Sequence, residues 1–173
     1  MVTDCVTPRR PYVRPEGYVP GVVYTVAFGR SADPVALPSK AGGSSGLLFD
    51  IRHLYAIVPD EAAGSAPSWR VTTRAYEYRI LDGLEQELLV FHWQPDAISR
   101  GPDFPHLHVS ATLVARSPSD YSRRVSLEKR HVPTGHVSLA AVIRLLIAEF
   151  GIAYRHRNWA SRLHRAEDII ERE

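Results

Sequence analysis

The period of the hydrophobic pattern changes once along this chain, and that change limits the folds open to it. Over residues 69–81 and 106–116, apolar side chains recur at every second position, as they do in strands that bury one face. After Pro133 the apolar residues are spaced for one face of a helix, at Leu139, Val142, Ile143, Leu146 and Phe150. Strands followed by helices predict an α+β fold, with an antiparallel sheet of about five to six strands and two C-terminal helices packed on one face.

The boundaries of these elements follow from turn and capping residues. The Asp82-Gly83 pair predicts the turn of a hairpin, with the positive φ at the glycine. Ser138 is placed to cap the first helix and Gly151 to end it, and Asn158 precedes a second helix over residues 159–171. Strands are expected over residues 21–28, 47–58, 69–81, 85–93 and 106–116, with a shorter one around 127–132.

The length and composition favour a single domain. The 173 residues are 45% hydrophobic, which is enough for one core. Four prolines between residues 8 and 20 predict an extended, proline-rich arm over residues 1–20, followed by one α+β domain over residues 21–173. The glycine- and proline-rich residues 29–46 are expected to form a loop.

Cysteine content and hydropathy bear on the compartment. Cys5 is the single cysteine, so neither an intrachain disulfide nor a four-thiolate zinc site can form. No apolar run approaches the roughly 18 residues of a membrane span, and the N-terminal residues lack the apolar core of a signal peptide. We therefore expect a cytoplasmic protein that has no contact with a membrane.

Positive charge is concentrated in the last third of the chain. The net charge is +2, but residues 116–165 hold ten Lys or Arg residues against three acidic ones. Such a region suits an anionic partner such as RNA, DNA or an acidic protein, although it equally describes a solvated face. The candidate nucleic-acid contacts are Arg74, Arg79, Arg130, Arg155, Arg157 and Arg162.

Three histidines lie at the ends of two expected strands. His92 ends one strand, and His106 and His108 begin the next, where positions i and i+2 project from the same face. If the two strands are antiparallel neighbours, the three imidazoles converge. Three histidines can bind zinc and leave a coordination position for water. They can also act as general acid and base without a metal, or simply form local hydrogen bonds.

Residues 72–109 hold an aromatic-alternating strand with Tyr76 and Tyr78, a turn, a second strand that reaches His92, and a proline-rich loop that closes on Pro105-His106-Leu107-His108. In this order of features the segment resembles the central signature of TumE-type toxins from bacterial toxin-antitoxin pairs. The resemblance implies a protein that acts on a nucleic acid or on translation and is held by a DNA-binding antitoxin.

Our leading hypothesis is therefore a toxin-like, RNA-directed protein that needs no cofactor. His106 and His108 would be the acid-base pair of a ribonuclease or other phosphodiesterase, with His92 as their neighbour and arginines at the phosphate. Two alternatives remain open. One is a non-catalytic module that docks a partner through its basic C-terminal helical face, and the other is a zinc hydrolase with His92, His106 and His108 as ligands.

Overall fold

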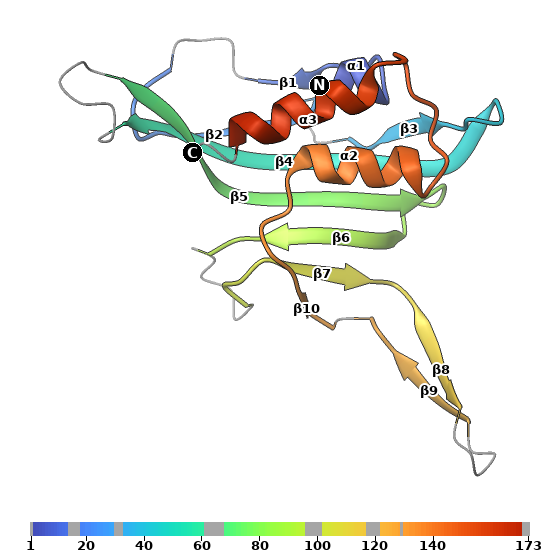
Figure 1. The fold of residues 1–173 in the computed structure, drawn as a ribbon. Helices are drawn as coiled ribbons and strands as arrows, with labels where there is room; N and C mark the ends of the chain where they lie inside the picture. Colours follow the sequence, from blue (N-terminus) through green and yellow to red (C-terminus); the bar gives the residue numbers. More distant parts are fainter. Residues whose placement is uncertain are drawn as a thin grey trace.

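A computed structural model describes residues 2–13, 18–29, 33–60, 68–95, 102–116, 122–128 and 130–170 of the chain. Its centre is an eight-stranded antiparallel sheet (Figure 1) with the order β1-β2-β4-β5-β6-β7-β10, in which β3 also pairs with β4. The strands of this sheet are β1 (Pro11–Tyr12), β2 (Val23–Phe28), β3 (Val35–Pro38), β4 (Ser44–Pro59), β5 (Trp69–Asp82), β6 (Glu87–Trp93), β7 (His106–Val109) and β10 (Val132–Pro133).

The remaining elements are three helices and a separate hairpin. The helices are α1 (Val2–Cys5), α2 (Leu139–Ala148) and α3 (Trp159–Ile170), and α2 and α3 lie side by side over one face of the sheet (Figure 1). The hairpin of β8 (Thr112–Arg116) and β9 (Ser122–Ser126) extends away from the sheet (Figure 1). The predicted α+β fold with helices on one face is therefore confirmed.

The hydrophobic core lies between the helices and the centre of the sheet. Alternate residues of β4 and β5 are fully buried there, including Ile51, Tyr78 and Ile80, and they pack with Ile143 and Leu146 of α2. Full burial of one such aliphatic side chain contributes about 1.5–3 kcal/mol. Residues that flank these positions on each strand must project from the opposite face of the sheet, because side chains alternate along a strand.

Local signals set the ends of α2 as expected. The Ser138 hydroxyl oxygen accepts a hydrogen bond from the Ala141 N–H at 3.0 Å, which satisfies one of the free donors of the first turn. Gly151 follows the helix with φ 65°, a conformation that costs glycine little.

Several expectations about the sheet are wrong. It has eight strands rather than five to six, because β1 lies in the expected arm and β3 in the expected loop over residues 29–46, where β4 also begins. The expected strand 106–116 is divided at Ser110 and Ala111 into β7 and β8. Of the described residues in the expected strand 127–132, only Val132 belongs to a strand. In the β5–β6 hairpin the positive φ of 61° falls on Glu85 rather than on Gly83.

The arm over residues 1–20 is not simply extended. Val2–Cys5 is helical, and the side chains of Cys5 and Val6 are fully buried in the core. Burial of these apolar side chains outweighs the tendency of a proline-rich segment to stay extended and solvated. Of the helices in the described part of the chain, none has the length and apolar character that crossing a membrane requires.

Candidate functional site

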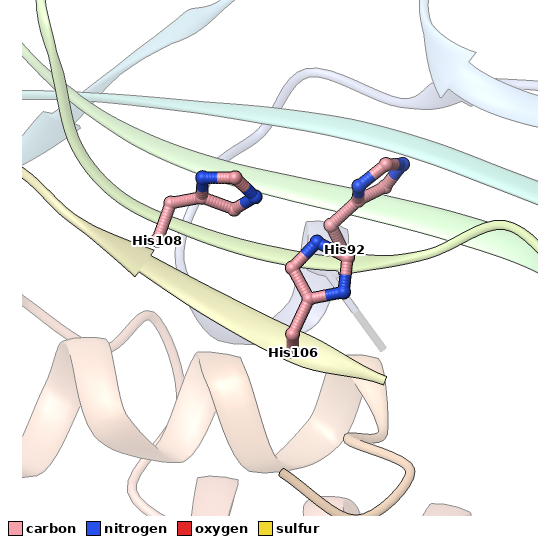
Figure 2. A group of neighbouring side chains, drawn as sticks. All are labelled: His92, His106 and His108. Carbon is pink, nitrogen blue, oxygen red and sulfur yellow. The ribbon is translucent and has the colours of Figure 1, made fainter. Parts of the chain in front are cut away.

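The histidines lie on the face of the sheet opposite the helices. Phe91 of β6 packs against the core, so its neighbours Val90 and His92 project from the other face. In the register between β6 and β7, His92 is paired with His106, and Val90 with His108. All three histidines therefore share one face, as Figure 2 shows.

The strand pairing brings the three imidazoles together as expected. The ring centroids of His92 and His106 are 5.0 Å apart, and those of His106 and His108 are 4.9 Å apart. One ring nitrogen from each of the three residues lies within 4.8 Å of the other two. In Figure 2 one ring nitrogen of each of the three histidines faces the space between the rings.

The two nitrogens of His106 have very different surroundings. His106 is 1% exposed, and its Nδ1 lies 2.8 Å from the Phe104 carbonyl oxygen. A carbonyl oxygen only accepts, so Nδ1 must carry a proton, and in the neutral ring Nε2 then presents a lone pair. This buried Nε2 has no hydrogen-bond partner among the described residues. A histidine whose Nδ1–H is fixed by a backbone carbonyl is oriented as metal ligands usually are.

A fourth histidine, His131, joins the group from the residue before β10. Its ring centroid is 4.7 Å from that of His106 and 4.6 Å from that of His108. Sequence reasoning missed it, because its proximity depends on the pairing of β10 with β7, in which Pro133 lies opposite His106. The available signal was the position of His131 within the short strand expected around residues 127–132, but nothing local specified which strand this segment would join.

The electrostatic environment of His108 and His131 favours their neutral forms. Burial lowers the pKa of His108, and the neighbouring rings of His106, His131 and His92 lower it further. The pKa of His131 is also lowered, first by desolvation and then by His106 and His92. Like charges so close together disfavour protonation. A neutral imidazole is the form that binds a metal.

The same face carries a cluster of charges on β4, β5 and β6. Arg79 donates from Nε to Asp50 Oδ2 at 2.9 Å, and its guanidinium lies 3.7 Å from Glu77 and 3.9 Å from Glu87. The Asp50 carboxylate is 2% exposed. Arg79 is therefore engaged by carboxylates, which reduces what it can offer to a phosphate.

An open groove of about 730 Å³ adjoins the histidines. His108 and His131 line it together with Glu85, Glu87 and Glu128, and no Lys or Arg is found among its described lining residues. A polyanion would meet repulsion from these carboxylates, whereas a neutral or cationic molecule would not.

The six arginines proposed as nucleic-acid contacts do not gather around the histidines. Arg155, Arg157 and Arg162 lie at or just before α3, which covers the other face of the sheet. Arg155 donates to the Thr3 carbonyl oxygen, and Arg162 Nε donates to Asn158 Oδ1 at 3.0 Å. Arg74 is exposed on β5, and the exposed Arg130 directly precedes His131. Their role as nucleic-acid contacts stays a prediction.

Comparison of the chain with protein-family models, with curated proteins and with solved structures found no match. The resemblance of residues 72–109 to TumE-type toxins therefore stays a prediction. The argument for a function has to rest on the site itself.

Proposed function

We propose that this protein is a zinc-dependent hydrolase whose metal is held by His92, His106 and His108. The observation that carries the proposal is the buried Nε2 of His106, which has a lone pair and no hydrogen-bond partner among the described residues. A buried polar atom without a partner costs about 1–3 kcal/mol. A bond from Nε2 to a metal ion removes that cost.

The ligand set matches the needs of a catalytic zinc ion. Neutral histidines leave its double positive charge undiminished, and three protein ligands leave one position for water. Water bound to such an ion has a pKa of about 7, so hydroxide is available at neutral pH. In tetrahedral zinc the ligand nitrogens lie about 3.3 Å apart, given Zn–N bonds of about 2.0–2.1 Å. The nitrogens now lie within 4.8 Å of one another, so they must approach by up to about 1.5 Å to reach this spacing.

The charge of the groove beside the site restricts the charge of the substrate. Its carboxylates favour a neutral or cationic ester or amide over a phosphodiester. Held by His92, His106 and His108, the ion would supply an activated water for hydrolysis of the ester or amide bond, with the water proton passing to the leaving group. The products would be a carboxylate and an alcohol or amine.

Metal analysis of the purified protein tests the proposal. After incubation with Zn²⁺ and removal of free metal, we expect one zinc per wild-type chain and much less in His92→Ala and His108→Ala. His156→Ala is the matched control, because His156 is exposed on the helix side and lies outside the cluster. His106→Ala is less suitable, since His106 is buried. Wild-type protein that binds no zinc, cobalt or nickel would rule the proposal out.

A second candidate is the toxin-like ribonuclease that works without a metal. The observation in its favour is the 4.9 Å separation of the His106 and His108 rings, which suits a paired general acid and base. Inducible expression in a bacterial host, with RNA integrity followed over time, separates the two functions. Growth arrest and RNA cleavage that persist in the presence of a chelator would favour the ribonuclease. Both should disappear in His108→Ala.

An acidic antitoxin would be the partner in this second function, and the basic segment before α3 is where we expect it to dock. Arg155 and Arg157 are exposed there. Charge reversal of both should weaken binding of the partner without affecting zinc content. Unchanged binding would leave this surface without a role.

A further inference from the structure

His131 is the member of the histidine group that the proposed three-ligand centre leaves unused. Its ring lies closer to His108, with 4.6 Å between centroids, than the ring of His92 does, at 6.4 Å. Its nitrogens are not among those that lie within 4.8 Å of one another, so binding the same ion requires its side chain to rotate toward the cluster. Unlike His106, its side chain is exposed. It comes from a different part of the chain, since His92, His106 and His108 belong to β6 and β7.

Two backbone hydrogen bonds and a short strand pairing hold the chain on either side of His131. The N–H of Arg130 donates to the Leu127 carbonyl at 3.0 Å, and the N–H of Thr134 donates to the Pro105 carbonyl at 2.9 Å. Between them, β10 pairs with β7 over two residues. This keeps the Cα of His131 beside the cluster, while its exposed side chain can move between rotamers without displacing core residues.

We infer that His131 is a fourth, displaceable ligand of the metal ion that the proposed function places at His92, His106 and His108. With His131 bound, the ion has four imidazole nitrogens and a closed tetrahedral shell. When His131 rotates away, a water molecule takes its position. The exchange replaces one neutral ligand by another, so the charge of the centre stays the same until the water loses its proton.

The coordination position that His131 would vacate faces the groove. His108 and His131 both line it. Departure of the His131 imidazole therefore opens the metal toward the groove, while His106 stays buried behind it. The closed form holds the ion without reactive hydroxide, and the open form presents hydroxide to a substrate in the groove. A substrate that binds the open form more tightly than the closed form shifts the population toward it.

Cobalt substitution tests this inference, because the visible spectrum of Co²⁺ reports the number and type of its ligands. Wild-type protein, His131→Ala and the control His136→Ala would each be loaded with Co²⁺ and titrated with thiocyanate. His136 is exposed and lies five residues after His131, but its ring packs against Trp93, with 4.3 Å between the ring centroids, and not against the histidine cluster. Far-UV circular dichroism would verify that all three proteins are folded.

We expect the wild type and His136→Ala to show an intense tetrahedral spectrum that responds weakly to thiocyanate. His131→Ala should still bind one Co²⁺ per chain, with affinity reduced by at least the roughly 10-fold that loss of a partner supporting a ligand costs. Its spectrum should weaken as water enters and should change strongly when thiocyanate binds.

Two results would overturn the inference, and they differ in what they leave standing. If His131→Ala has the same spectrum, affinity and thiocyanate response as the wild type, His131 is not a ligand, and the three-histidine centre remains. If the wild-type protein binds no Co²⁺, the proposed function fails, and the role of His131 fails with it.

Discussion

At the scale of single residues, His53 and His106 show how the surroundings of a ring determine its role. His53 Nδ1 lies 2.7 Å from the Tyr78 hydroxyl, and its Nε2 lies 3.4 Å from the Thr73 hydroxyl. Both of its nitrogens therefore have partners within the fold. His106 has one nitrogen bonded to a carbonyl and the other, buried, without a partner among the described residues. His53 needs nothing further, whereas His106 lacks one interaction that a ligand can supply.

Zinc affinity should depend on pH in a way that reflects the lowered pKa of His108. Protons compete with zinc for the imidazole nitrogens. Because the pKa of His108 is lowered from its ordinary value of 6.5, protons compete effectively with zinc at His108 only at a pH below 6.5. We expect affinity to change little from about pH 8 to about pH 7 and to fall steeply toward about pH 5. Titration with a competing zinc indicator would measure this. Affinity that is unchanged down to about pH 5 would mean that histidines are not the ligands.

His53 should make the metal-free protein less stable in acid. Burial lowers the pKa of His53 below 6.5, so below that pH the unfolded chain binds a proton that the folded chain does not. Stability from this residue is therefore complete above pH 6.5 and declines as the pH falls toward the lowered value. Urea unfolding in the presence of a chelator should show a shallower pH dependence in His53→Gln than in the wild type. Equal slopes would contradict the assignment.

At the scale of elements, the site depends on the register of two short strands. The pairing of His92 with His106 places three histidines on one face, and a shift by one residue would turn the β7 histidines toward the helices. Helix α2 lies on the opposite side and takes no part in the site, but its start is linked to the sheet, since the Val137 N–H donates to the Tyr76 hydroxyl at 3.0 Å. The segment just before α2 therefore helps to hold β5 against the helical layer.

Removal of the α2 cap should lower stability without affecting the metal. Ser138→Ala eliminates the hydrogen bond from the Ala141 N–H to the Ser138 hydroxyl oxygen. We expect a loss of about 1 kcal/mol in the free energy of unfolding, measured by urea denaturation. Ser138→Asp should retain most of the stability, because a carboxylate oxygen can accept the same bond. Equal stability of Ser138→Ala and the wild type would show that this cap contributes little.

At the scale of the whole molecule, one face of the sheet packs against the helices and stabilises the fold, and the other face carries the candidate site. The face under α2 and α3 is apolar and forms the core. The other face carries the histidines and the charged cluster around Arg79. Because packing on one face and ligation on the other use different side chains of the same strands, changes to one need not disturb the other.

Substitution of a core leucine should lower the stability of the protein without changing its zinc content. Leu146→Ala removes a fully buried side chain of α2 and should cost about 2–5 kcal/mol. Leu84, which is 81% exposed, provides the control, and Leu84→Ala should be nearly neutral. While folded, both variants should bind as much zinc as the wild type. Loss of zinc from folded Leu146→Ala would show that the two faces are coupled.

The α+β class, the two helices and the hairpin of β5 and β6 could be predicted from the sequence, because hydrophobic period, caps and turns are local properties. The grouping of His92, His106 and His108 was also within reach, since alternation and the pairing of neighbouring strands require it. The tertiary structure decided what local pattern does not encode. Long-range pairing joined β3 and β10 to the sheet and brought His131 to the cluster, while core packing buried Cys5 and Val6. These placements depend on which distant backbone and apolar groups find one another, and only the folded chain specifies that.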